Sequence, residues 1–420
     1  MNVGRLVGRL GPQHLLTLAR HVAGGSEFLI TANERLTRRQ LFARIDALAA
    51  GLQALGARKG DRIATLLPAC PEAVYALFVP WVLGSVEVSL DPRLGEAALR
   101  RILADCAVKI VLTTRSWRSR DPAATVAGLR PHLPGLRFVI ATSPGRHEHG
   151  AAFSIEGLMT SEVAPWRARI SLKEPGRIAC VATPGRPLRA IEHARGAGWG
   201  LATAAARPHL DPAALRCLLL PFSPCHPAAP LGIMAALLAG GKVILMDHFE
   251  PQQALELIER EQVTQFCGTP GMYRRLLQAP AQTRCDLSSL RRATLAGGFC
   301  PPELVTAIGH RLCCPLERIY GTAESGLISW TAPGDPRRLI ANTVGRPAPH
   351  VEVRLVDSRR RPLPADEPGE IAVRSPQMML GYHNDPEATC DALDRDKWFY
   401  TGDLGALDTD GCLHLLGRLR

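Results

Sequence analysis

The sequence predicts an α/β protein whose last part is mainly β. Over the first two thirds of the chain, stretches with apolar residues at helical spacing alternate with short apolar runs, a pattern typical of sheets covered by helices. From about residue 345 the pattern changes to short strands separated by turns. A length of 420 residues and a hydrophobic content of 46% allow two or three domains. We therefore expect an α/β body followed by a small, mostly antiparallel β unit.

The alternation is regular as far as residue 114. Residues 37–57 carry apolar side chains at helical spacing and stop at a glycine, which predicts a helix. Residues 61–68 predict a buried strand, and residues 72–85 predict an apolar helix. The remaining elements expected in this part are a strand within 84–92, a helix over 95–106 and a strand over 108–114.

The next stretch, residues 115–172, is rich in Pro, Gly and Arg and predicts a lid or an irregular connecting region. Alternation resumes at residue 176, with a helix expected over 252–262. The strands expected on either side of that helix lie within 177–183, 217–222, 241–247 and 263–270. The strands of the last part are expected within 350–364, 369–375 and 410–417.

Charge and composition argue against a nucleic-acid partner. The net charge is +11, but the chain has only five lysines, and its arginines are scattered without a dense basic tract. Aromatic residues make up only 5% of the chain, so no series of stacking side chains accompanies the basic ones. We expect no nucleic-acid partner.

Cysteine usage and hydropathy indicate a cytoplasmic protein. The twelve cysteines are dispersed and form no C-x-x-C pair, so reduced thiols are the preferred interpretation. The N-terminus lacks an apolar segment followed by a small-residue cleavage site, and we expect no signal peptide. The longest uncharged run, 217–241, contains four prolines, so we expect no transmembrane segment.

Residues 179–189, with the sequence ACVATPGRPLR, follow an apolar run and contain a glycine. A strand that runs into a glycine-containing turn is typical of a loop that holds phosphate. This stretch has a single glycine, a proline in its middle and no lysine. Two interpretations therefore stay open from these residues alone: an altered phosphate loop, or a stretch that never had this function.

A series of motifs, in order along the chain, resembles the adenylate-forming superfamily, which comprises acyl-CoA synthetases, peptide-synthetase adenylation domains and luciferases. Each motif alone is weak, but together they cover nearly the whole chain in the family's order and spacing. They include LTRRQLFARIDALAAGLQALGARKGDRIATLLP (36–68), VTQFCGTPGMYRRLL (263–277), ATLAGGFCPPEL (293–304), IYGTAESG (319–326), NTVGRPAPHVEVRLVD (342–357) and WFYTGDLGALDTDGCLHLLGR (398–418).

The resemblance implies a fold of two αβ-layered subdomains with mixed sheets plus a small antiparallel β subdomain. It places a first αβ subdomain at 1–172, with an irregular connector at 115–172. A second subdomain at 173–340 would carry the altered loop and the Tyr-Gly-x-x-Glu stretch. A β subdomain at 341–417 would end at the family's hinge, and the C-terminal domain that follows in the family would be absent.

The activity implied is an ATP- and Mg²⁺-dependent joining of a small-molecule carboxylic acid to AMP, with release of pyrophosphate. The acyl group would then pass to a thiol, either that of coenzyme A or that of an acyl carrier protein. Because this first step brings two anions together, it needs cations and hydrogen-bond donors around the phosphates.

The stretch from Tyr320 to Glu324 matches the family pattern Tyr-Gly-x-Thr-Glu. The resemblance implies that Tyr320 stacks on adenine, that Gly321 lets the backbone come close, and that Glu324 holds Mg²⁺ and acts in catalysis. The sequence departs from the pattern at Ala323, where the family has a threonine, and Thr322 stands one place early. An ordinary turn after a strand is the alternative interpretation.

Five further positions follow from the resemblance. Gly297 and Gly298 match the glycine pair beside adenine, with a plain turn as the alternative. Asp403 would accept the ribose hydroxyls, and Arg418 corresponds to the family's arginine near the ribose. A solvated aspartate and an unpaired surface arginine are the alternatives. His226 is a candidate for the acyl pocket, but its spacing is stretched by prolines, which favours a structural role.

Compared with the family pattern Tyr-Thr-Ser-Gly-Thr-Thr-Gly-x-Pro-Lys-Gly, residues 179–189 keep only Thr183, Gly185 and Pro187. The resemblance implies a catalytic role for Thr183. The family's lysine is replaced by Leu188, so that Arg186 or Arg189 would have to supply the missing charge. Each lost charge-assisted hydrogen bond to phosphate costs roughly 1.5–3 kcal/mol. We therefore interpret the stretch as the family's phosphate loop in an altered form.

Three hypotheses about function remain open. The first is a ligase of acyl-CoA synthetase type, impaired by the altered loop and by the early end of the chain. The second is a catalytically weak or inactive protein of the same fold that binds an acyl or adenylate ligand or a partner. The third is a subunit that works with a separately encoded C-terminal half.

Overall fold

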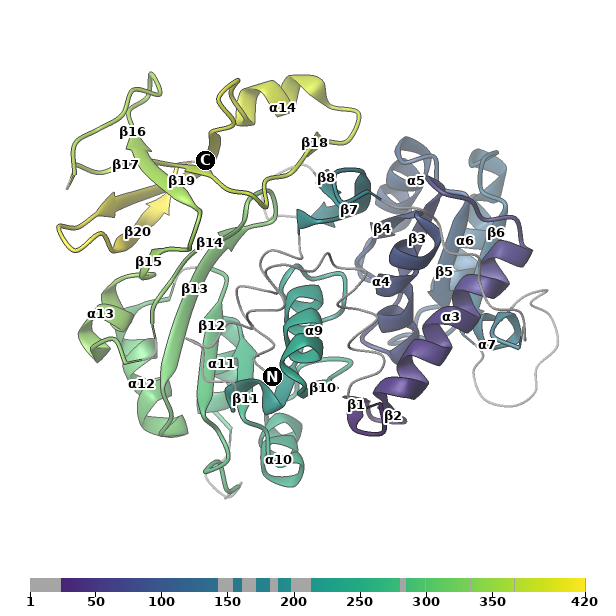
Figure 1. Ribbon diagram of the computed structural model, residues 1–420, viewed down its shortest axis with the longest axis horizontal. Coiled ribbons are helices and arrows are strands. Elements are labelled where there is room, and N and C mark those ends of the chain that lie inside the picture. The colour runs from purple at the N-terminus through teal and green to yellow at the C-terminus, as the bar shows by residue number, and fades with distance from the viewer. Residues whose placement is uncertain are drawn as a thin grey trace.

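The computed structural model describes residues 24–142, 154–160, 171–181, 188–197, 213–279, 285–298, 300–332, 334–365 and 367–419. Within these residues the chain forms two large mixed sheets, helices that cover them, and a separate antiparallel sheet (Figure 1). This is the fold class that the sequence predicts.

The seven-stranded sheet is parallel at its centre and antiparallel at one edge. β4, β3, β5 and β6 run parallel, and β7 joins β4 in parallel. β8 pairs antiparallel with β7, and β18 pairs antiparallel with β8. In sheet order the strands are β18 (Gly381–Tyr382), β8 (Arg189–Ala194), β7 (Pro175–Val181), β4 (Val86–Ser89), β3 (Arg62–Leu66), β5 (Ile110–Thr114) and β6 (Phe138–Thr142).

The nine-stranded sheet also has a parallel centre, from β1 to β13, with antiparallel strands at both edges. In sheet order the strands are β15 (Arg346–Pro347), β14 (Gly326–Trp330), β13 (Leu316–Thr322), β12 (Arg292–Ala296), β11 (Gln265–Gly268), β9 (Cys217–Leu220), β10 (Lys242–Leu245), β1 (Glu27–Ile30) and β2 (Arg35–Thr37). The β1–β2 hairpin therefore lies in the same sheet as strands that follow it by about two hundred residues.

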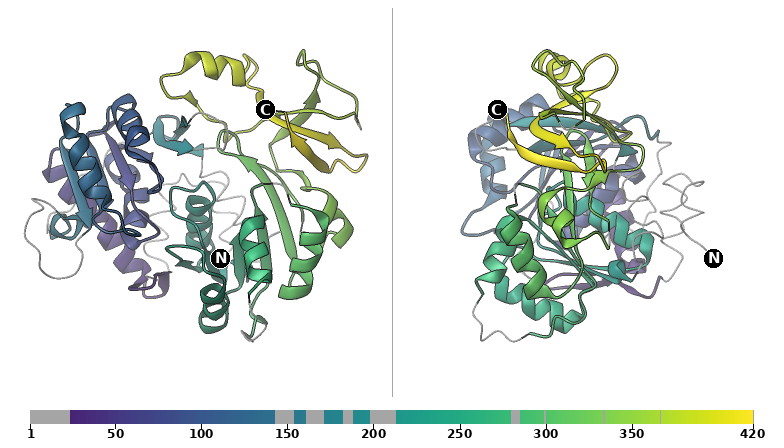
Figure 2. Two further views of the ribbon diagram at one scale, coloured as in Figure 1. Left: turned by 180° about the vertical axis from the view of Figure 1, so that it is seen from behind. Right: turned by 90° about the vertical axis from the view of Figure 1, so that its left-hand side faces the viewer.

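The third sheet is antiparallel throughout and lies beyond the β13–β15 edge of the nine-stranded sheet (Figure 1; Figure 2). Its strands, in sheet order, are β16 (Glu352–Val356), β17 (Gly369–Arg374), β19 (Phe399–Leu407) and β20 (Leu413–Arg418). This is the small β unit that the change of pattern at residue 345 predicts.

Thirteen helical segments accompany the sheets within the described residues, and each long one has a local reason for its ends. α3 begins with a capping box in which the Thr37 hydroxyl and the Gln40 side chain each accept a backbone hydrogen bond from the other residue. α4 ends at Gly84, whose φ of 69° suits a glycine. The helices are α3 (Arg38–Ala54), α4 (Pro71–Leu83), α5 (Glu96–Asp105), α6 (Pro122–Leu129), η1 (Arg130–His132), α7 (Ile155–Leu158), η2 (Ala214–Arg216), α9 (Ala228–Ala239), α10 (Pro251–Glu261), α11 (Pro270–Leu277), α12 (Pro302–Leu312), α13 (Arg337–Asn342) and α14 (Pro386–Ala392).

The largest apolar core joins the two large sheets. Buried residues of α3, α4 and α9 pack together with residues of β3 and β5 from one sheet and of β9 and β10 from the other. A second core lies under α10, α11 and α12, and a third lies between the seven-stranded sheet and α5 and α6. Helices therefore lie between the sheets and on their outer faces, as α/β layering requires.

Two sequence predictions need comment. Residues 122–142 fall in the stretch expected to be irregular, but they form α6 and β6, and β6 is an edge strand of the seven-stranded sheet. The expectation was wrong for these residues, because Pro122 stands in the first turn of α6, where a proline starts a helix instead of breaking it. The subdomain boundaries at 172 and 340 stay predictions.

Candidate active site

A cavity of about 580 Å³ lies where the carboxyl ends of β12 and β13 meet β8, β19 and β20. β12 and β13 are parallel neighbours, so the turns that follow them open at the same edge of the sheet, where α/β proteins commonly bind ligands. We call this space the larger cavity. Eight of the ten predicted site residues line it: Gly297, Gly298, Tyr320, Gly321, Thr322, Glu324, Asp403 and Arg418.

Three side chains that line the larger cavity are linked by one hydrogen bond and one ion pair. The Tyr320 hydroxyl donates to Oδ2 of Asp403 at 2.8 Å, and Nε of Arg418 lies 3.3 Å from Oδ1 of the same carboxylate. Asp403 and Arg418 are directly opposite each other on β19 and β20. Burial raises the pKa of Tyr320 well above its usual value, and the charge of Asp403 adds to the effect. Tyr320 therefore stays protonated and orients Asp403.

A second carboxylate, that of Glu324, also lines the cavity, and a second tyrosine orients it. The Tyr382 hydroxyl donates to Oε1 of Glu324 at 3.0 Å, and the Arg189 guanidinium lies 4.3 Å from the centre of the Tyr382 ring. Burial raises the pKa of Tyr382, and the charge of Glu324 contributes. Both carboxylates of the cavity are thus fixed by phenolic hydroxyls from distant elements.

The predicted glycines are required by backbone geometry. Gly297 and Gly298 have φ values of 76° and 77°, and a side chain at either position would extend into open space. Gly321 is different, because a Cβ there would lie 2.3 Å from the carbonyl oxygen of Gly326. The close approach that requires Gly321 is therefore that of the neighbouring strand β14.

The turn after β13 uses its hydroxyl groups locally. Oγ1 of Thr322 lies 2.9 Å from Oγ of Ser325 and accepts a hydrogen bond from the Ser325 backbone N–H. Ala323, which departs from the family pattern, offers only a methyl group to the cavity. Thr322 is thus held in a defined orientation at the cavity's edge.

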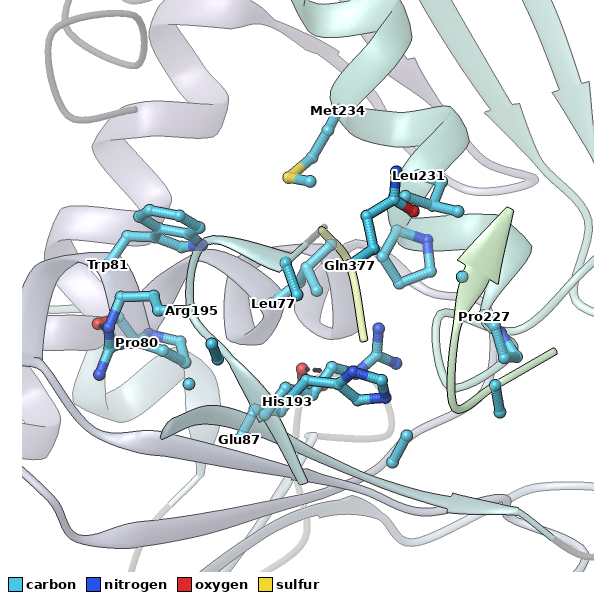
Figure 3. A pocket seen from close by; sticks show the side chains of 18 of the residues that line it. Leu77, Pro80, Trp81, Glu87, His193, Arg195, Pro227, Leu231, Met234 and Gln377 are labelled. Atoms are coloured by element: carbon cyan, nitrogen blue, oxygen red, sulfur yellow. Dashed lines mark hydrogen bonds and ion pairs between the residues drawn. The ribbon is translucent and has the colours of Figure 1, made fainter. Parts of the chain in front are cut away.

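A smaller cavity of about 130 Å³ adjoins the larger one, and Thr322 and Ala323 line both. Most of its wall is apolar and comes from α4 and α9, with Trp81 on the α4 side and Met234 on the α9 side (Figure 3). The remaining wall comes from β4, β7 and β8 and from Gln377. The apolar residues that line it include Leu77, Pro80, Trp81, Pro227, Pro230, Leu231 and Met234.

The polar groups of the smaller cavity are largely neutral or paired. Arg177 places Nε 3.4 Å from a carboxylate oxygen of Glu87, and its Nη2 donates to Ser89 Oγ at 2.9 Å. Burial raises the pKa of Glu87, and Arg177 opposes that shift. Burial and the charge of Arg177 lower the pKa of His193 to about 4, so the His193 ring is neutral at pH 7.

Arg195 forms the base of this cavity. It is 5% exposed, and its guanidinium donates to the carbonyl oxygens of Pro80, Gly84, Ser85 and Pro175. The guanidinium thereby caps the C-terminal end of α4, where carbonyls lack helical partners. It holds α4 against β7.

Two predicted residues do not line the larger cavity. His226 stacks on Phe222 with the ring centres 4.5 Å apart, and its Nδ1 accepts a hydrogen bond from the Ala228 backbone at the start of α9. Desolvation and the nearby charges of Arg93 and Arg177 lower the pKa of His226 to about 4. Thr183 lies outside the described residues, as does Arg186. The roles of both predicted residues stay predictions.

Several cavity residues were not singled out from the sequence. Tyr382, Glu87, Arg177 and His193 were assigned no role from the sequence. Glu87, Arg177 and His193 line the smaller cavity, and Tyr382 contacts Glu324 and Arg189, which line the larger one. Arg189 was considered only as one of two replacements for the lost lysine. Strand alternation along 188–191 is the signal that could have assigned it to the cavity face.

The described residues contain no group of three or more His, Cys, Asp and Glu side chains arranged to hold a metal ion. All twelve cysteines are free thiols. None of the described helices combines the length and the apolar character that crossing a bilayer requires.

The larger cavity has room for a nucleotide and lies at the carboxyl ends of parallel strands. Together with the two mixed sheets and the small antiparallel sheet, it matches the architecture of the N-terminal part of adenylate-forming enzymes. The AMP-binding enzyme family matches residues 18–167 and 190–383. The chain belongs to this family.

Its relatives include ligases that act on aromatic acids. It is 32% identical over 396 residues to a feruloyl-CoA synthase from an Amycolatopsis species, covering 92% of this chain and 74% of the relative. It is 29% identical to the 2-hydroxy-7-methoxy-5-methyl-1-naphthoate–CoA ligase of Streptomyces carzinostaticus, covering 99% of this chain and 76% of the relative.

Among solved structures, the amide bond synthetase McbA from Marinactinospora thermotolerans superposes with a TM-score of 0.82. The two chains are 28% identical, and the match covers 97% of this chain and 79% of McbA.

Proposed function

We propose that this protein activates a carboxylic acid with ATP. A carboxylate oxygen of the acid attacks the α-phosphorus, a P–O bond forms, and the bond to pyrophosphate breaks, so that acyl-AMP and pyrophosphate result. The acyl group then passes to a thiol, and AMP leaves. The observation that carries the proposal is the convergence of Tyr320, Asp403 and Glu324 on one cavity of about 580 Å³.

The adenosine part fits the Tyr320 side of the larger cavity. Asp403 is fixed by Tyr320 and Arg418, and its oxygens keep lone pairs that can accept ribose hydroxyls. The glycine pair presents bare backbone to the same space, which lets a flat base approach closely. These residues are assigned the binding of the nucleoside.

Mg²⁺ fits the Glu324 side. Oε1 of Glu324 accepts a hydrogen bond from Tyr382, and the described residues provide no partner for Oε2. Mg²⁺ usually binds through one or two carboxylates together with phosphates and water, so one oriented carboxylate suffices. When bound, the ion would neutralise phosphate charge, while Glu324 would fix its place next to Thr322 and Ala323.

The acid is assigned to the smaller cavity. Its apolar wall and its shared edge at Thr322 and Ala323 allow a substrate body to lie inside while its carboxylate reaches the nucleotide. The cavity has room for about one ring, and Trp81 offers an aromatic face. The feruloyl and naphthoate ligases among the relatives support a compact aromatic acid. Coenzyme A is the preferred acceptor, and a carrier-protein thiol is the alternative.

One observation favours a second, non-catalytic function. Val181, where the family pattern has a serine, presents an apolar side chain to the larger cavity. A chain with fewer phosphate donors would bind a nucleotide or an acyl-adenylate without forming one.

The test combines calorimetry with pyrophosphate exchange. Wild-type protein is titrated with AMP and then assayed for ATP–pyrophosphate exchange with benzoate, a cinnamate and octanoate. We expect AMP binding in the micromolar range, exchange that depends on an aromatic acid, and a 10- to 100-fold weaker AMP affinity in Asp403→Asn. AMP binding without exchange for any acid supports the non-catalytic function. Failure to bind AMP rejects both functions.

A further inference from the structure

We propose that Arg189 supplies the cation that holds the distal phosphates of ATP, in place of the lysine that the phosphate loop lacks. This inference rests on the proposed function and adds a specific residue to it. It starts from the position of β8, whose first residue is Arg189 and which pairs with β7 so that Val181 and Arg189 are opposite each other. Val181, Arg189 and Ile191 line the larger cavity.

Strand alternation explains why the charge lies at 189 and not at 188. Leu188 and Ala190 pack against the apolar core that lies under α5 and α6, on the face of the sheet turned away from the cavity. Successive side chains of a strand point to opposite faces. A lysine at position 188 would therefore be directed into this core, whereas the next residue carries its charge into the cavity. Compared with the family's lysine position at 188, the positive charge lies one residue later, at Arg189, and therefore on the other face of the sheet.

Contacts with β18 hold the Arg189 guanidinium in place. The group lies 4.3 Å from the centre of the Tyr382 ring, and Tyr382 is 7% exposed. The same tyrosine donates to Glu324 at 3.0 Å. A single ring thus sets the position of a cation on its face and of a carboxylate at its hydroxyl. A cation–π contact orients the guanidinium without neutralising its charge.

Among the arginines that line this cavity, Arg189 is the one whose guanidinium can still bind a ligand's phosphate. Three arginines line the cavity. Arg418 pairs with Asp403, and Arg318 is buried and donates to the carbonyl oxygens of Ile340 and Ala341. Within the described part of the chain, Arg189 makes no ion pair with a carboxylate. Its planar group can donate two parallel hydrogen bonds to phosphate oxygens.

If Arg189 binds the distal phosphates, its loss should weaken the binding of ATP but not that of AMP. AMP has no phosphates beyond the first, so Arg189 should contribute little to its binding. ATP extends its β- and γ-phosphates toward Glu324 and Arg189. Loss of the guanidinium should weaken ATP–Mg²⁺ binding by about 10- to 100-fold, while AMP affinity changes less than about 3-fold.

The test is isothermal titration of the 420-residue chain with AMP and with ATP–Mg²⁺. The variants are Arg189→Ala, Arg189→Gln and Arg189→Lys, and the control is Arg101→Ala, which removes an exposed arginine of α5. The glutamine variant retains a long polar side chain should the alanine variant fail to fold, and AMP binding reports the fold of each. We expect Lys to restore part of the ATP affinity and the control to match wild type.

The outcomes separate the inference from the proposed function. Weakened ATP binding with normal AMP binding in the alanine and glutamine variants supports the role of Arg189. Equal effects on both nucleotides, or none, overturn that role and leave the proposed function standing. A wild-type chain that binds neither nucleotide overturns both.

Discussion

The two cavities share Thr322 and Ala323 in their walls but differ in their charged groups. In the larger cavity, Asp403 and Glu324 each accept a hydrogen bond from a tyrosine, which fixes a carboxylate without neutralising it. In the smaller cavity, the carboxylate of Glu87 is buried against Arg177. The ring of His193, whose pKa burial lowers to about 4, is uncharged there at pH 7.

The difference indicates which part of a ligand each cavity accepts. Transfer of an unpaired charge into an apolar space is costly, so the smaller cavity favours an uncharged substrate body. The larger cavity offers carboxylates, a guanidinium and exposed backbone, which suit a nucleotide and its metal ion. A ligase needs this division, because its acid is apolar except at the carboxylate that reacts.

The largest effect is expected from Glu324→Gln, which keeps the shape of the side chain but removes the carboxylate charge that is proposed to hold Mg²⁺. We expect ATP–pyrophosphate exchange to fall about 100- to 1,000-fold, because charge stabilisation of the phosphates is lost. AMP binding should change less than 3-fold. The control is Glu352→Gln on the exposed face of β16. Retained exchange in Glu324→Gln would remove this residue from the catalytic step.

A smaller effect is expected from Leu231→Trp, which fills the smaller cavity. The extra ring should raise the KM for the acid about 10-fold or more and leave ATP binding unchanged, because Leu231 does not line the larger cavity. The control is Leu380→Trp, at a residue that is 45% exposed. An unchanged acid KM would mean that the substrate body lies elsewhere.

The smallest effect concerns stability and pH. The pKa of His193 is about 4 in the folded chain, below its usual value near 6.5, so the folded state binds fewer protons. Its contribution to stability is present above pH 6.5 and is lost as the pH falls toward 4. Because the ring is partly exposed, we expect a loss of about 1–2 kcal/mol. His193→Gln should reduce the difference between urea midpoints at pH 7 and pH 4.5, and an unchanged difference contradicts the assignment.

Much of the fold follows from local patterns. Period-2 and period-3.6 apolar spacing locates α3, α4, α5 and α10 and the strands that alternate with them, because backbone geometry determines which side chains share a face. No element was predicted at α9, α12, β13 or β19. The failure at 122–142 shows the limit of composition, since Pro122 starts α6 where a high proline content suggested irregular structure. The place of the β1–β2 hairpin in the nine-stranded sheet was likewise not predictable from spacing.

The residues of the candidate site likewise fall into those that the sequence predicted and those that it did not. Gly297, Tyr320, Glu324 and Asp403 were predicted because they belong to contiguous motifs. Tyr382, Glu87 and His193 were assigned no role, because their contacts and their places at the cavities come from sheet pairing and not from local sequence. Gly321 was predicted to let the backbone come close to the nucleotide, which stays a prediction, and the close approach that the structure shows there is that of the Gly326 backbone.

By itself, the sequence determined the α/β class, the change to a small β unit and the turns that need glycine, since each depends on backbone geometry within a few residues. Only the tertiary structure decided that two tyrosines orient two carboxylates in one cavity and that Arg189 faces it while Leu188 faces a core. The physical reason is that such contacts come from sheet pairing and core packing between segments up to two hundred residues apart, which no local pattern encodes.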